Sequence, residues 1–179
     1  MKKSNSVVKY HEELKKTIIS LQVECEAMEL AIKSQYMIYA NNWSTFYDIT
    51  KDTRKKLEEY RKLIECYQHE LGDKVYINTW VGTDCYAYEV VEMVTPCKWI
   101  IRQLDTKLTQ QGQDALSESF IPGGYMGHYD NDCQEWEYAS NENNPTYTVI
   151  RHSKTRPFCC WGSKSYPENE PCRHHDYNF

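Results

Sequence analysis

The segment FIPGGYMGHYDN, residues 120–131, holds the residues whose types and spacing best suit ligand binding. Gly123 and Gly124 permit backbone dihedrals that a Cβ would forbid, and they let a ligand approach backbone N–H groups closely. Phe120 and Tyr125 offer flat rings, on which a nucleobase gains on the order of 1–3 kcal/mol by stacking. The segment therefore favours a site for a planar, phosphate-bearing ligand.

Hydrogen-bonding groups of the right kind follow the glycines, lie on predicted strands, or lie in the turn after one of these strands. His128 and Asn131 can read a purine edge or hold a ribose hydroxyl. Arg102, Arg151 and Arg156 can pair with a pyrophosphate through bidentate forks. Together they predict a nucleotide pocket. Each residue also has a structural alternative, because rings can belong to the core, glycines to a tight turn, and strand arginines to the solvent-facing side.

Catalytic signatures are absent from the sequence. It contains no G-x-S-x-G, no Walker loop and no H-E-x-x-H. His174 and His175, followed by Asp176, could supply a base with an orienting carboxylate, or metal ligands, although adjacent side chains on an extended segment point apart. We therefore predict a protein that is not an enzyme, with hydrolysis by His128 or by His174/His175 as the alternative.

The eight cysteines predict reduced thiols rather than a zinc site. They are scattered, and none forms a C-x-x-C pair. Cys159 and Cys160 are adjacent, which places their side chains on opposite faces of a strand. We predict partly buried free thiols and expect neither a metal nor a cofactor.

Length and charge restrict the class of partner. The 179 residues suffice for one core, or for one compact domain with an extension. Residues 1–72 carry 12 basic and 11 acidic side chains, whereas residues 73–179 carry 9 and 15. No basic stripe is present to bind a long nucleic acid. No run of 18 apolar residues occurs, and the first residues are charged, so we expect a soluble, unexported protein without a membrane segment.

The first part of the chain has helical periodicity. Apolar residues recur every three or four positions from Val7 to Tyr39, and again from Phe46 to Leu71. Gly72 suits the end of the second helix, and the linker at residues 41–43 is short. We predict an antiparallel helical hairpin over residues 5–72, within a domain 1–72, that packs on the following domain or on another subunit. A solvated coiled-coil spacer is the alternative.

After Gly72 the period changes to two. Six segments rich in β-branched and aromatic residues read as strands, separated by turn signals and without an intervening helix. They are DKVYINTWV, CYAYEVVEMV, CKWIIRQLDTKL, CQEWEYAS, TYTVIRHS and PFCCWGS. The predicted class is α+β, in which the hairpin is followed by a small, curved, mainly antiparallel sheet or open barrel over residues 73–179.

Several of these segments resemble a family of small bacteriophage proteins. They are GDKVYINTWVGTDCYAYEVVE, the loop FIPGGYMGH with Asn131 after it, QEWEY, TYTVIRHSKTR and the ending DYNF. The chain is similar, over roughly residues 72–179, to the phage Thoeris anti-defence sponges, the first-described family that sequesters cyclic ADP-ribose isomers.

This resemblance implies a sponge acting in the cytoplasm of the infected bacterial host. Such proteins bind the cyclic ADP-ribose isomer, such as glycocyclic ADP-ribose, made by bacterial Thoeris TIR proteins, and they do not cleave it. The resemblance implies a homo-oligomer, a dimer or hexamer, and in some members a separate site for cyclic trinucleotides. The resemblance implies that Phe120 stacks on the adenine of the messenger and that Asn131 hydrogen-bonds to the messenger. It also implies that Arg102 and Arg151 contact a phosphate or stack on a base. A protein-binding inhibitor of a host defence protein is a further alternative.

Overall fold

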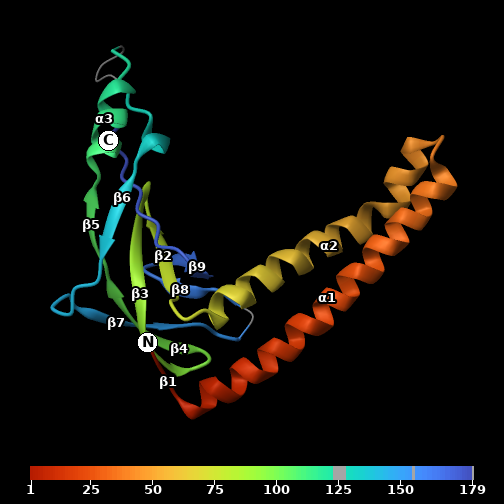
Figure 1. The fold of residues 1–179 in the computed structure, drawn as a ribbon, viewed down its shortest axis with the longest axis horizontal. Coiled ribbons are helices and arrows are strands. Elements are labelled where there is room, and N and C mark those ends of the chain that lie inside the picture. The colour runs from red at the N-terminus through yellow and green to blue at the C-terminus, as the bar shows by residue number, and fades with distance from the viewer. Residues whose placement is uncertain (123–127, 155, 179) are drawn as a thin grey trace. The chain divides into compact units, whose positions relative to one another are not determined.

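A computed structural model describes residues 1–122, 128–154 and 156–178 of the chain. Two long helices, α1 (Asn5–Tyr39) and α2 (Trp43–Leu71), form the predicted helical hairpin (Figure 1). The chain divides into two compact units, one made of Val8–Leu71 and one made of Met1–Val7 with Gly72–Phe179. The first seven residues, which the sequence-based division placed with the helices, thus belong to the β unit.

The helices of the hairpin pack through the predicted apolar seam. Its buried residues are Tyr10, Leu14, Ile18, Cys25, Leu57, Ile64 and Tyr67. Ile49 continues the predicted apolar spacing after Phe46, but it is 47% exposed. Thr50 beside it is buried instead, and its hydroxyl donates a hydrogen bond to the carbonyl of Phe46. A second apolar stripe of α1 remains exposed, made of Ile19, Val23, Leu30 and Met37.

The β unit is an antiparallel sheet that is nearly closed and barrel-like, as the predicted fold class requires. Its strand order is β10 (Pro167–Glu168), β2 (Tyr76–Val81), β3 (Asp84–Thr95), β4 (Lys98–Gln103), β7 (Thr146–Ile150), β8 (Phe158–Cys160) and β9 (Ser163–Ser165). The short β1 (Lys2–Lys3) pairs in parallel with β3. Thr79 of β2 and Ser165 of β9 share a buried hydroxyl–hydroxyl hydrogen bond of 2.8 Å, which joins the last strand of this order to the second.

A separate two-stranded ribbon and a short helix extend from this sheet. The ribbon consists of β5 (Asp105–Leu108) and β6 (Trp136–Ala139), so the single strand predicted over residues 97–108 is in fact two strands. The helix α3 (Gln110–Glu118) overturns the expectation of strands without an intervening helix. Thr109 caps its N-terminus, since the Thr109 hydroxyl accepts a hydrogen bond of 2.9 Å from the N–H of Gly112. Gly112 lies near the start of this helix, and because glycine disfavours helices, the sequence pattern did not predict it.

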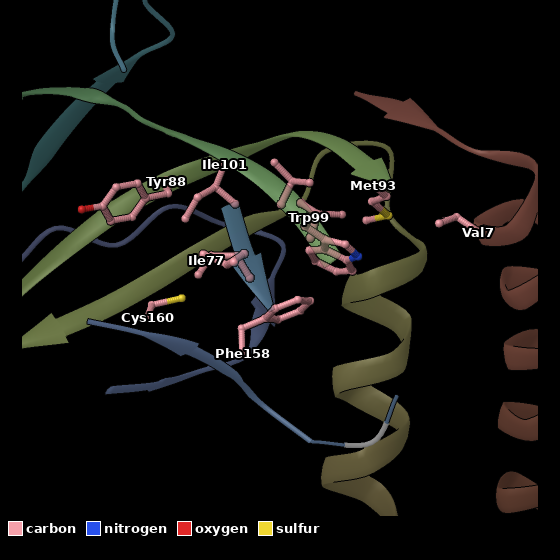
Figure 2. Packing of buried hydrophobic residues seen from close by; sticks show 11 residues of the cluster. Val7, Ile77, Tyr88, Met93, Trp99, Ile101, Phe158 and Cys160 are labelled. Atoms are coloured by element: carbon pink, nitrogen blue, oxygen red, sulfur yellow. The ribbon is translucent and has the colours of Figure 1, made fainter. Parts of the chain in front are cut away.

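The core of the β unit consists of buried side chains that the strands of the curved sheet direct toward one another (Figure 2). Trp99 and Phe158 are fully buried, with ring centroids 4.4 Å apart. Cys160 is buried and Cys159 is exposed, which confirms that adjacent residues of this strand face opposite sides. The remaining members of the cluster are Val7, Val75, Ile77, Tyr88, Val90, Met93, Ile101 and Val149.

Candidate ligand-binding site

The C-terminal segment, residues 172–178, lies against the start of β3. The backbones of Cys85 and His174 exchange two hydrogen bonds, of 2.9 and 3.1 Å. The N–H of Cys172 donates to Asn78 Oδ1 at 2.9 Å. The segment is therefore held like a short additional strand.

Asp84, the first residue of β3, is the main anchor of this segment. Its carboxylate accepts a hydrogen bond from the N–H of Asp176 at 2.9 Å and from the Tyr86 hydroxyl at 3.2 Å, and lies 3.0 Å from His175 Nδ1. Burial by itself would raise the pKa of Asp84. The hydrogen bonds from Asp176, His175 and Tyr86 outweigh burial and lower the pKa below its usual value.

Arg173, within this segment, is held by backbone carbonyls and aromatic rings. Its Nη1 donates to the carbonyls of Cys85 at 2.7 Å and of His174 at 2.9 Å. Its guanidinium also lies 4.3 Å from the ring centroid of Tyr86 and 5.5 Å from that of Trp136. The side chain is only 13% exposed, so Arg173 positions the segment instead of facing a ligand.

Side-chain amides join the segment to the loop after α3. Asn178 makes two hydrogen bonds with the backbone of Tyr129, of 2.7 and 3.1 Å. Asn131 donates through Nδ2 to Asp176 Oδ1 at 2.7 Å and accepts from the N–H of Tyr177 at 3.3 Å. Asn131 also begins a short 3₁₀ turn, η1 (Asn131–Cys133). The loop and the chain end thus form one hydrogen-bonded unit.

Four rings follow one another across this unit, and we name them the aromatic row. The ring centroids of Phe120 and Tyr129 are 4.9 Å apart, those of Tyr129 and Tyr177 are 6.2 Å apart, and those of Tyr177 and His175 are 4.6 Å apart. Phe120, at the end of the row, is 40% exposed. A largely pre-positioned row with a half-open terminal ring can accept a planar group by stacking.

Of the predicted site residues, three come together here. Phe120 belongs to the aromatic row and Asn131 to the amide network. His128 is exposed, and its backbone exchanges hydrogen bonds of 2.8 and 3.1 Å with Ile121, which closes the loop at its base. The predicted ligand residues Gly123, Gly124 and Tyr125 lie outside the described residues.

The three predicted arginines lie elsewhere. Arg102 Nε pairs with Glu89 at 2.7 Å, and its Nη2 donates to Ser140 at 3.2 Å. Arg151 is 4% exposed, and its Nε and Nη2 both donate hydrogen bonds to the backbone carbonyl of Pro96. Figure 1 shows β7, which precedes Arg151, at the opposite end of the β unit from α3. Arg156 is exposed in the turn before β8. None of these contacts joins the arginines to the aromatic row.

Sequence reasoning missed Asp84, Arg173 and Asn178 as parts of the site. Asp84 reads as a turn residue, and the chain end carries no periodic pattern. The signal that was available is composition, because CRHHDYN concentrates donors, acceptors and rings within seven residues. The two histidines do point apart as expected: His174 packs on Trp80, with centroids 5.4 Å apart, whereas His175 faces Asp84.

Cavities among the described residues of both units lie away from the aromatic row. One of about 310 Å³ in the β unit is lined by residues that include Tyr76, Glu89 and Tyr138. One of about 600 Å³ in the hairpin is lined by apolar side chains such as Ile32 and Phe46 together with charged ones such as Arg61. Within the described residues, no three His, Cys, Asp or Glu side chains gather as a metal site would require.

Comparisons with protein-family models, with curated proteins and with solved structures find no match for this chain. The resemblance to the phage sponges therefore rests on the motifs given above. Across the described ranges, no helix has both the length and the apolar character needed to cross a membrane.

Proposed function

We propose that this protein binds and sequesters a cyclic ADP-ribose-type messenger, such as glycocyclic ADP-ribose, without cleaving it. The observation that carries the proposal is the aromatic row, whose terminal ring, Phe120, is 40% exposed beside a hydrogen-bonded loop. The motif resemblance to phage sponges supplies the ligand class. In this proposal the protein acts in the cytoplasm of an infected bacterium.

The geometry supports binding through pre-organisation. Asn178 and Asn131 hold the loop before a ligand arrives, so little ordering entropy is lost when a base stacks on Phe120. Retention depends mainly on a slow off-rate, which a stacked and partly enclosed ligand favours. Because Arg151 is used inside the protein, we assign no phosphate contact to it.

The experiment is capture and release with the full chain. Purified protein is mixed with glycocyclic ADP-ribose and filtered, and the retained protein is heat-denatured, with mass spectrometry of both fractions. Depletion of the filtrate and recovery of intact messenger after heating support sequestration. Absence of depletion contradicts the proposal and favours a protein-binding inhibitor.

Phe120→Ala tests the assigned ring, and Ile121→Ala is the matched control. Ile121 is the adjacent residue and is 67% exposed. Loss of stacking worth on the order of 1–3 kcal/mol predicts a roughly 5- to 150-fold weaker affinity for Phe120→Ala. Calorimetry should show little change for Ile121→Ala. Equal affinities of the two variants would remove Phe120 from the site.

A second candidate function is hydrolysis of the same messenger, favoured by one specific contact. His175 Nδ1 lies 3.0 Å from the Asp84 carboxylate, an arrangement that can orient an imidazole as a general base. This candidate predicts cleavage products that accumulate with time. It also predicts that His175→Ala retains binding but loses turnover, with His128→Ala as the comparison at the other predicted histidine.

A further inference from the structure

Two of the eight cysteines meet where the C-terminal segment joins β3. Cys85 is fully buried on β3, whereas Cys172 is exposed. The Cys85 thiol donates a hydrogen bond to the backbone carbonyl of Cys172 at 3.5 Å, which places its sulfur beside Cys172. The backbone bridge between Cys85 and His174, together with the bond from Cys172 N–H to Asn78, holds the two cysteines in this position.

We propose that Cys172 and Cys85 form a peroxide-sensitive thiol pair, in which Cys172 is oxidised first and Cys85 then closes a disulfide that locks the C-terminal segment onto β3. The oxidant is hydrogen peroxide. In the first step the Cys172 thiol and peroxide give a sulfenic acid and water. In the second step the Cys85 thiol displaces the sulfenic oxygen, which leaves as water, and the S–S bond forms. A dithiol reductant reverses the reaction.

Their environments assign the two roles. The neighbouring Cys85 thiol lowers the pKa of Cys172 to about 7, against the opposing effects of burial and of the Glu168 carboxylate. The same interaction and burial raise the pKa of the Cys85 thiol. Cys172 is therefore the nucleophile that peroxide reaches, and Cys85 is the protected partner that resolves the sulfenic acid.

The lowered pKa sets the expected rate. A thiol of pKa about 7 is half ionised at pH 7, whereas an ordinary thiol of pKa about 8.5 is only about 3% ionised. A thiolate of lower pKa is intrinsically less nucleophilic, which offsets part of the gain from its larger ionised fraction. We expect Cys172 to react about threefold faster than an ordinary exposed thiol.

The test uses the full chain, reduced, freed of reductant and exposed to hydrogen peroxide for increasing times. Remaining thiols are alkylated, and non-reducing digestion with mass spectrometry identifies the linked peptides. We expect a Cys85–Cys172 disulfide to form first and to protect the amides of residues 173–178 from hydrogen exchange. Disulfides that join other cysteines first, or oxidation of Cys172 beyond sulfenic acid while Cys85 stays reduced, would overturn the proposal.

Variants separate the two steps. Cys172→Ser should abolish the disulfide, whereas Cys159→Ser, at another exposed cysteine, should leave it unchanged. In Cys85→Ala, a sulfenic acid should accumulate at Cys172 and be trapped by dimedone. If Cys85→Ala does not fold, the Cys172→Ser and Cys159→Ser comparison still decides the outcome. None of these readouts depends on messenger binding.

Discussion

Replacement of Asp84 by asparagine tests whether one carboxylate holds the C-terminal segment in place. Asp84 accepts from the Asp176 N–H and contacts His175 Nδ1, and it also accepts from the Tyr86 hydroxyl. Asparagine offers a single acceptor oxygen and no charge, so it can keep the Asp176 bond but not the full set. Loss of one hydrogen bond to a charged group costs about 1.5–3 kcal/mol.

This cost should appear as local opening of residues 172–178. Because every 1.4 kcal/mol is a factor of ten, the protection factors of these amides should fall about 10- to 150-fold in Asp84→Asn. Hydrogen exchange followed by mass spectrometry measures this change. Asp105→Asn is the matched control. Asp105 is likewise a hydrogen-bonded carboxylate, which accepts from the side chains of Asn141 and Asn144, but it lies on the β5–β6 ribbon and does not contact the C-terminal segment through these bonds.

Acidification should reproduce the effect in the unaltered protein. The folded pKa of Asp84 lies below its usual value, since hydrogen bonds from Asp176, His175 and Tyr86 outweigh the opposing effect of burial. The carboxylate therefore contributes stability that is fully present above the unfolded pKa and is lost as pH falls through the folded pKa. Unchanged protection in Asp84→Asn, or an equal loss in Asp105→Asn, would refute this account of the segment.

Two further substitutions test packing. Gly112→Ala would place a Cβ 2.7 Å from the backbone oxygen of Glu135, so we expect the free energy of unfolding in urea to fall by about 1–2 kcal/mol, although alanine is the better helix residue. The exposed Gln111→Ala, in the same turn of α3, should have almost no effect. Arg151→Met leaves a backbone carbonyl without its two donors and should cost about 1–3 kcal/mol, whereas the exposed Arg156→Met should stay within about 0.5 kcal/mol. Equal urea midpoints for the two variants of a pair would contradict the packing argument made for that pair.

The elements of this fold could be predicted where periodicity is long and regular. The hairpin follows from a seam that repeats every three or four residues, because such spacing leaves one apolar face per helix. The sheet follows from alternation, as Cys159 and Cys160 illustrate with one exposed and one buried thiol. The helix α3 could not be predicted in this way, because it is only nine residues long and contains Gly112.

Tertiary structure decided which polar residues meet. Asp84 and Asp176 are hydrogen-bonded although they are 92 residues apart, and Asn178 binds the backbone of Tyr129 across 49 residues. Arg151, which as a strand arginine suggested a phosphate ligand, is buried under a turn. By itself the sequence determined the local periods and the aromatic, glycine-rich loop. Only the tertiary structure determined the partners, because contacts between distant residues depend on the path of the whole chain and not on local residue preference.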